Sequence, residues 1–459
     1  MSTGNRVQSG LYKGTIGSLN FEARLDVDGT YPQMQFSLML SNFSCHYIAH
    51  MQSVSDNKWE GDIWYRQNSR NVQFGNVTPN KLVAEYISGS TVKLLKFTYK
   101  RDNNDLWTGT IPRISDYFRL TEFEIDYEEG IDQWLTYNTN SLPRPTDVDD
   151  EELTVEKSFG RAGIQVTRSG EVNKVSGTGS GVDARWNNQE LHDAMLANWS
   201  RNEGTLWAMW VFLAKQFKDD PESVTFGIMF DTIGSFQRSG TAIFSQSIAD
   251  FYPPGIPNRN AIIQRHHFRT LIHEIGHAYN LLHSWQKTLG TPWISLVVNE
   301  RGAGSFMNYP SRYPGGEDAF WRDFAFRFSD QELLFLRHAP EAFVNMGTAN
   351  FGTNHAESAP TRELMQQLSN LDPNQATLKL ELRVNKQRPV FQYMESVALE
   401  LKLTNISNKP RSVDKTILKD VAHMTISVTR NQSETKQYRS YARPCYAQKE
   451  ITLQPGQSL

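Results

Sequence analysis

Short runs of alternating apolar and polar residues follow one another from residue 11 to about residue 135. Clear examples are residues 11–16, 35–40 and 91–97, and turn-favouring pairs such as Asp28-Gly29 separate the runs. Because successive side chains of a strand point to opposite faces, such alternation is typical of half-buried antiparallel strands. We therefore predict an N-terminal all-β domain, similar to a β-sandwich, over residues 1–138.

The hydrophobic pattern changes in the middle of the chain, where two periods are mixed. Apolar residues have helical spacing in residues 187–201 and 206–217, whereas residues 223–231 and 240–244 are short apolar runs typical of strands. Helices that alternate with strands predict an α/β fold. We assign residues 157–347 to this central α/β domain.

Two polar segments separate the central domain from its neighbours. Residues 139–156 contain two prolines and acidic residues and are predicted to be a linker, as are the polar residues 348–375. Alternation then returns in residues 377–384 and 397–403, which predicts an immunoglobulin-like β-sandwich over residues 376–459. The chain stops in a turn-like sequence, so this last domain is expected to be truncated, and the whole protein is expected to be multidomain.

Composition narrows the possible functions of the 459-residue chain. A formal net charge of −3 and the lack of a basic run with interleaved aromatic residues argue against nucleic acid as a partner. The sequence contains no apolar run near 18 residues, so no transmembrane segment is predicted. The start of the chain has no Sec-type signal peptide, which leaves a cytoplasmic location and leaderless secretion both open. Oligomeric state is not indicated by the sequence.

The strongest chemical signal is the stretch His-Glu-Ile-Gly-His-Ala-Tyr-Asn-Leu-Leu-His at residues 273–283. His273 and His277 are four residues apart, so both imidazoles project from one face of a helix and can bind one zinc ion. Glu274 can accept a proton from the attacking water, and His283 can supply a third ligand beyond the helix end. Three protein ligands with one open position are typical of a catalytic Zn2+ site.

A second segment extends this pattern, because residues 305–310 read Ser-Phe-Met-Asn-Tyr-Pro. A long histidine motif followed by a methionine turn resembles the metzincin metallopeptidases. The resemblance covers about 190 residues and implies a zinc-dependent endopeptidase acting on a protein or peptide substrate. It implies His273, His277 and His283 as metal ligands, Glu274 as general base, Met307 as the turn residue beneath the ligands, and Tyr309 as a residue near the metal.

The resemblance also suggests where a substrate would bind. Thr241, Ala242 and Ile243 resemble the edge strand that borders the metzincin cleft, along which an extended peptide adds as an antiparallel strand.

Two helix ends can be placed from sequence. The zinc helix is expected over about residues 265–280, and Asn280 stands where the family usually has glycine. Asparagine is the next best tolerated residue in the left-handed backbone region, so the turn that ends the helix is expected to form. Ser329 and Glu332 have the spacing of a capping box and predict the start of a later helix.

Other readings of the sequence stay open. Glu300 could be the third ligand of a gluzincin-type site, in which a downstream glutamate replaces the third histidine. Cys45 could be a latency thiol that occupies the zinc. The chain could also be a non-catalytic binding or scaffold protein with a metallopeptidase-like domain. Finally, the first domain could bind glycans through aromatic residues, of which Trp59, Trp64 and Tyr65 are examples.

Overall fold

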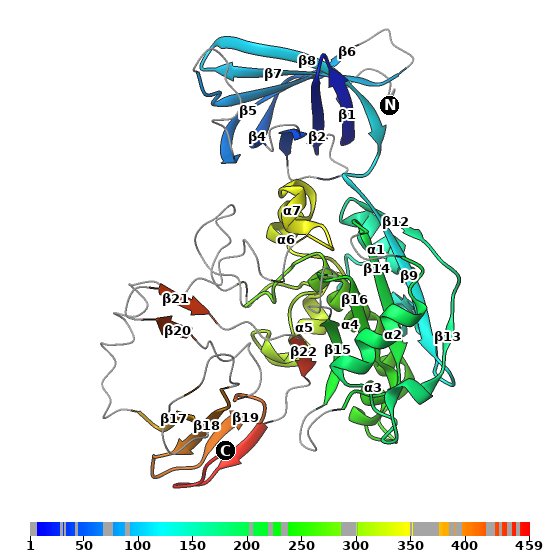
Figure 1. Cartoon of the computed structure of the whole chain (residues 1–459), viewed down its shortest axis with the longest axis vertical. Coiled ribbons are helices and arrows are strands. Elements are labelled where there is room, and N and C mark those ends of the chain that lie inside the picture. Colours follow the sequence, from blue (N-terminus) through cyan, green and yellow to red (C-terminus); the bar gives the residue numbers. More distant parts are fainter. Residues whose placement is uncertain are drawn as a thin grey trace.

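A computed structural model gives the architecture of the chain (Figure 1). It describes residues 7–27, 31, 34–41, 45–67, 77–87, 92–201, 205–218, 224–230, 237–285, 300, 302–348, 351, 376–384, 391, 397–418, 427–430, 434–437, 443–446 and 450–459. The described protein is multidomain and mostly β, with few helices. No helix among these residues is long and apolar enough to cross a lipid bilayer.

The N-terminal strands form a closed antiparallel barrel, at the top of Figure 1. Its strands are β1 Gly10–Ile16, β2 Leu19–Leu25, β3 Gln35–Leu40, β4 Cys45–Ser55, β5 Lys58–Gln67, β6 Lys81–Ile87, β7 Leu94–Arg101 and β8 Asn104–Ser115. The all-β prediction is confirmed, but the sandwich-like arrangement was wrong. The sheet closes on itself because β8 pairs back with β1, where Leu11 lies opposite Ser115.

Side chains fill the interior of the barrel. The ring of Phe21 lies 5.0 Å from the rings of both Phe97 and Trp107, and these residues belong to one buried apolar cluster or pack against it. Along β2, Phe21, Ala23 and Leu25 point inward, as the alternation predicted.

A seven-stranded sheet lies below the barrel, in the strand order β12-β9-β14-β16-β15-β22, with the short β13 paired to β9. The strands are β9 Arg119–Glu128, β12 Ile164–Arg168, β13 Lys174–Val175, β14 Ala208–Ala214, β15 Thr225–Phe230, β16 Gly240–Phe244 and β22 Arg443–Tyr446. The first four strands of this order are parallel, β15 pairs antiparallel with β16, and β22 pairs antiparallel with β15. Strand β9 comes from the stretch 1–138 that the sequence assigned to the first domain, yet it pairs within this sheet.

The strand β14 corrects the helix predicted over residues 206–217. All seven residues of β14 are buried. Met209, Val211 and Leu213 belong to the core on the face covered by α4, whereas Trp210 and Phe212 belong to the core on the opposite face. A strand buried on both faces is a continuous apolar run, and periodicity cannot distinguish such a run from a buried helix.

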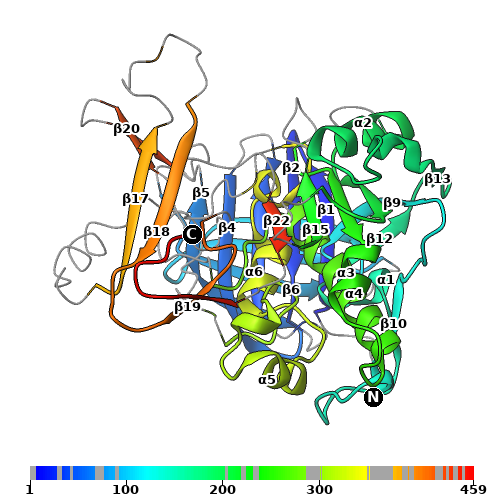
Figure 2. The same ribbon diagram turned by 90° about the horizontal axis from the view of Figure 1, so that it is seen from below.

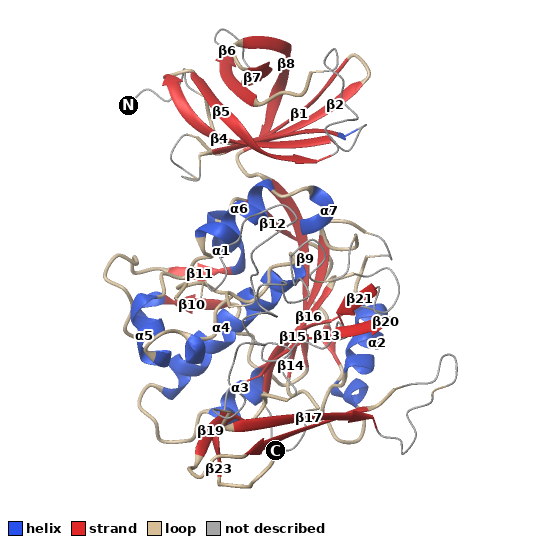
Figure 3. Cartoon of the chain, turned by 90° about the vertical axis from the view of Figure 1, so that its left-hand side faces the viewer, coloured by secondary structure: helices blue, strands red, loops and turns tan. Residues whose placement is uncertain are grey.

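Helices cover the sheet and connect it to the barrel (Figure 3). They are α1 Val155–Arg161, α2 Asn188–Asn198, α3 Ser245–Phe251, α4 Arg259–Ala278, α5 Gly316–Asp323, α6 Asp330–His338 and α7 Glu341–Val344. The capping box predicted at the start of α6 is confirmed, because Ser329 and Glu332 exchange side-chain and main-chain hydrogen bonds.

The barrel packs on the C-terminal end of α6. His338 shares hydrogen bonds with Asp26 (2.8 Å) and Ser37 (3.1 Å) of the barrel side. Ile48 and Tyr65 of the barrel join the main core of the helices and the central sheet. The barrel and the central sheet therefore share a continuous, buried interface.

Of the two segments predicted as linkers, the structure describes the first and only isolated residues of the second. Strands β10 Thr136–Asn138 and β11 Glu152–Thr154 pair with each other, so the predicted linker 139–156 folds back on itself. The predicted linker 348–375 lies almost wholly outside the described residues.

The C-terminal region forms separate strand pairs (Figure 2). Strand β17 Leu378–Val384 pairs with β18 Leu399–Asn405, β19 Arg411–Asp414 with β23 Glu450–Leu453, and β20 Ser427–Arg430 with β21 Glu434–Gln437. These pairs agree with a β-rich C-terminal region. The immunoglobulin-like arrangement of residues 376–459 stays a prediction.

Candidate metal centre

The helix α4 carries the first two histidines of the predicted site. Every residue from Arg265 to Ala278 on this helix is buried, and α4 packs on β15 and β16. His273 and His277 are fully buried, one turn apart, and their ring centroids are 4.5 Å apart. The helix thus holds two imidazoles in a rigid, water-poor setting.

The end of α4 brings the third histidine back to the first two. Asn280 has a φ of 69°, the main-chain N–H of Asn280 donates to His277 O (2.8 Å), and that of Leu281 donates to Gly276 O (3.0 Å). This pair of bonds around one left-handed residue is the Schellman arrangement that ends helices. The prediction that Asn280 adopts the left-handed conformation is confirmed.

His273, His277 and His283 form one cluster, in which a nitrogen of each ring lies within 4.8 Å of the others. The closest pair is Nε2 of His277 and Nε2 of His283, at 3.2 Å. All three residues are buried. Within the described part of the chain, no hydrogen-bond partner is found for Nε2 of His273.

Main-chain carbonyls orient the two helical imidazoles. Nδ1 of His273 lies 2.7 Å from the carbonyl oxygen of Phe306, and Nδ1 of His277 lies 2.7 Å from that of Leu281. A carbonyl only accepts hydrogen bonds, so each Nδ1 carries the proton and each Nε2 keeps a lone pair. Such outer partners fix ring orientation and tautomer in metal sites.

Burial favours the neutral imidazole at His273. The pKa of His273 lies well below its ordinary value, first because the ring is buried and then because His277, Arg269 and His283 add positive charge nearby when protonated. A neutral imidazole is the form that binds a metal ion.

Glu274 lies on the side of α4 that faces β15. It is fully buried. A β-carbon at Gly227 of β15 would lie 2.7 Å from Cγ of Glu274 and 2.7 Å from Cγ2 of Thr270. Only glycine therefore lets this strand approach the carboxylate so closely.

The predicted methionine turn lies against the same helix. Met307 is fully buried, and a β-carbon at Gly276 would collide with its sulfur, so Met307 packs where α4 has no side chain. The main-chain N–H of Ser284 donates to Met307 O (3.1 Å), which links this turn to the segment that carries His283. The ring of Tyr309 lies 4.8 Å from that of His283 and 5.6 Å from that of His273.

The predicted substrate edge strand was misplaced. Thr241, Ala242 and Ile243 lie in β16, which is fully buried and pairs with β14 on one side and β15 on the other. A short apolar run does not reveal whether its strand lies inside a sheet or at its edge. The antiparallel strand next to Glu274 is β15, and β22 pairs along its outer side.

Two alternative metal partners named from sequence lie elsewhere. Glu300 accepts a hydrogen bond from Ser329 at the start of α6 (2.9 Å). Cys45 lies in the apolar interior of the barrel, where burial raises the pKa of its thiol to about 11.

Of the aromatic residues considered for glycan binding, Tyr65 is buried in the main core, whereas Trp64 is 39% exposed and donates to Gln35.

Three residues around the cluster were not found from sequence. Arg269 donates to Phe306 O (3.2 Å) and to Asn308 O, so it fixes the segment whose carbonyl orients His273. The sequence feature that could have identified Arg269 is its position, a charged residue one helical turn before His273. Trp285 stacks on His283 and Arg312 lies over the ring of Trp285, and no sequence signal connects these two positions.

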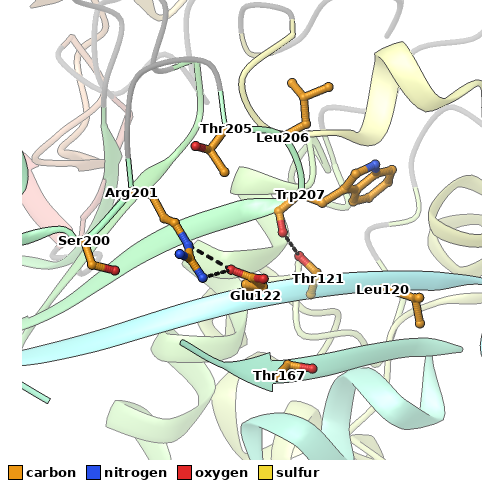
Figure 4. A pocket seen from close by; sticks show the side chains of 9 residues that line it. All are labelled: Leu120, Thr121, Glu122, Thr167, Ser200, Arg201, Thr205, Leu206 and Trp207. Carbon is orange, nitrogen blue, oxygen red and sulfur yellow. Dashed lines mark hydrogen bonds and ion pairs between the residues drawn. The ribbon is translucent and has the colours of Figure 1, made fainter. Parts of the chain in front are cut away.

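A separate hollow lies at the start of β9 and β14 (Figure 4). Thr121 donates to Trp207 O there, and Arg201 pairs with Glu122. None of the three clustered histidines lines it.

A scan against protein-family models finds no match for this chain, and a comparison with curated proteins finds none either.

Proposed function

We propose that this chain is a zinc-dependent endopeptidase of the metzincin type, in which His273, His277 and His283 hold Zn2+. The observation that carries the proposal is the buried convergence of three imidazole nitrogens within 4.8 Å, beside the buried carboxylate of Glu274. Three neutral nitrogen donors with an open position are the donor set of catalytic zinc sites.

The fit of the residues to zinc is supported by their hydrogen bonds. The Nδ1 atoms of His273 and His277 are committed to carbonyl oxygens, which leaves Nε2 of each ring for the ion. Glu300, the ligand of the gluzincin alternative, bonds to Ser329 instead. These contacts favour the three-histidine set over that alternative.

The chain's own residues would carry the proton transfers. A bound zinc ion supplies a Lewis acid that lowers the pKa of a water and polarises the scissile carbonyl. Glu274 accepts the proton of the attacking water and then passes it to the leaving amine. Tyr309, adjacent to His273 and His283, donates a hydrogen bond to the developing oxyanion.

The test combines metal content with cleavage of a broad peptide library, for the wild-type chain and for Glu274→Ala and Glu274→Gln. We expect one bound zinc in all three proteins, and a loss of cleavage of at least about 100-fold in both variants, since general bases contribute 10²–10⁴-fold. Glu171→Gln, an exposed site away from the cluster, is the matched control and should keep full activity.

Zinc binding without any cleavage of the library would leave a scaffold or binding role as the better explanation. A wild-type chain that binds no zinc would refute the proposal.

A further inference from the structure

His283 differs from the other two clustered histidines in how it is supported. His273 and His277 are held by α4, whereas His283 lies in the segment after the helix has ended. The ring of His283 is therefore positioned by groups outside the helix, and one such partner stacks on it.

That partner is Trp285. The rings of His283 and Trp285 are stacked with centroids 4.6 Å apart and an interplanar angle of 6°. Parallel, stacked rings at this spacing attract each other beyond their buried area. Stacking leaves the edge of the imidazole, where the nitrogens lie, available to a metal ion.

A second segment holds Trp285 in place. The guanidinium carbon of Arg312, at the end of the turn Pro310–Arg312, lies 4.4 Å from the centre of the Trp285 ring. The ring of Tyr309 lies 4.5 Å from that of Trp285 and 4.8 Å from that of His283. Cation–π contact and edge-on aromatic packing thus join the segment carrying His283 to the segment after Met307.

The stack is not part of the main apolar core. Trp285 is partly exposed and does not belong to the apolar cluster formed by α4 and the central sheet. Among the described residues, the Trp285 ring has aromatic or cation–π contacts with His283, Tyr309 and Arg312. Removal of the indole should therefore disturb the third histidine more than the fold.

We propose that Trp285, held by Arg312, is a positioning residue that fixes the imidazole plane of His283 for metal binding. This inference rests on the proposed zinc site. It assigns a stacking partner to the third ligand.

The test measures zinc affinity by competition with a chromophoric chelator, for wild type, Trp285→Ala, Trp285→Phe and Arg312→Met. Loss of an outer partner weakens metal binding by 10–100-fold, so we expect about a tenfold loss or more for Trp285→Ala. Trp285→Phe keeps a stacking ring and should recover most of the affinity. The zinc affinity of Arg312→Met should lie between those of Trp285→Ala and Trp285→Phe. Trp64→Ala, a partly exposed tryptophan of the barrel, is the matched control.

A spectroscopic readout separates positioning from general damage. The visible absorption of the Co2+-loaded protein reports ligand geometry, and Trp285→Ala should change it while the melting temperature of the metal-free protein stays as in wild type. If Trp285→Ala misfolds, Arg312→Met still decides the question.

The outcomes distinguish this inference from the proposed function. Wild-type zinc affinity and an unchanged Co2+ spectrum in Trp285→Ala and Arg312→Met would overturn the positioning role, even with an altered KM for peptides. Weakened zinc binding in these variants, in a protein that cleaves no peptide, would support positioning and reject the peptidase. Absence of zinc binding by the wild type would reject both.

Discussion

Buried histidines other than the clustered three tie the stability of this protein to pH. His267 is fully buried on α4, next to Ser245 (3.0 Å) and the carbonyl of Trp134 (3.1 Å), and burial lowers its pKa from 6.5 to about 4. Below pH 6.5 the unfolded chain takes up a proton that the folded protein accepts only near pH 4. The contribution of His267 to the free energy of unfolding is therefore present above pH 6.5 and is lost, by about 3 kcal/mol, as the pH falls to about 4.

We expect His267→Gln to reduce the slope of the unfolding free energy against pH between pH 6.5 and pH 4. The reduction corresponds to up to one proton fewer taken up on unfolding. Urea unfolding of both proteins across this range measures it, because the slope reports the difference in bound protons between the two states. Parallel curves for the two proteins would show that His267 titrates alike in the folded and unfolded chain.

At the scale of residues, the sequence was most informative where chemistry depends on local spacing. His273 and His277 share a helix, so their separation fixes their geometry, and the clustering with His283 agrees with the predicted ligand set. Trp285 and Arg312 could not be found in this way. Their contact depends on the paths of two non-helical segments, and periodicity carries no information about these paths.

The end of α4 shows how one residue controls an element. Asn280 occupies the left-handed region and its side chain donates to Phe343 O (2.9 Å). Asn280→Ala loses this bond and replaces a residue that tolerates the left-handed region with one for which that region costs about 1–2 kcal/mol, so we expect a total loss of about 2 kcal/mol. Asn280→Gly loses only the bond and should cost about 1 kcal/mol.

Chemical unfolding of the metal-free proteins measures the free energy of unfolding of both variants. The decisive result is that Asn280→Gly is more stable than Asn280→Ala. Equal losses would mean that the side-chain bond alone matters and that the backbone tolerates alanine there. Under the proposed function, a weakened turn in either variant should also reduce zinc affinity, because His283 follows Asn280 by three residues.

Among the elements, the pattern placed one buried helix and two buried strands correctly but misassigned a third buried strand. The helix α4 and strands β15 and β16 lie where the pattern placed them. Strand β14 was predicted as a helix because its two faces are both buried, which removes the alternation that marks a strand. The interior position of β16 was missed because the pattern along one strand does not show whether strands pair along both of its sides.

For the whole molecule, alternation identified an all-β first domain but not its closure. Closure depends on the pairing of β1 with β8, about 100 residues apart in the chain. The alternation likewise did not reveal the interface between the barrel and the central sheet. Along β2, Glu22 and Arg24 alternate with inward apolar residues as if solvent-facing, yet both are buried. A polar outer face can thus be a domain interface.

The strand β22 joins two distant parts of the chain at the candidate site. It pairs antiparallel with β15, with Cys445 opposite Gly227, the glycine that contacts Glu274. An extended peptide that adds to the outer side of β15 would need the same main-chain groups. Under the proposed function, β22 and a peptide substrate therefore compete for one edge.

Weakening this pairing should consequently raise peptidase activity. Cys445→Pro removes a main-chain donor from β22 and should increase kcat/KM for short peptides severalfold, with zinc content unchanged. Thr429→Pro makes the same change in β20, which pairs with β21 rather than with the central sheet, and should leave the rate as in wild type. Equal kcat/KM for Cys445→Pro and wild type would mean that peptides bind away from β15. A reduced rate with intact zinc would mean that β22 supports the site instead of blocking it.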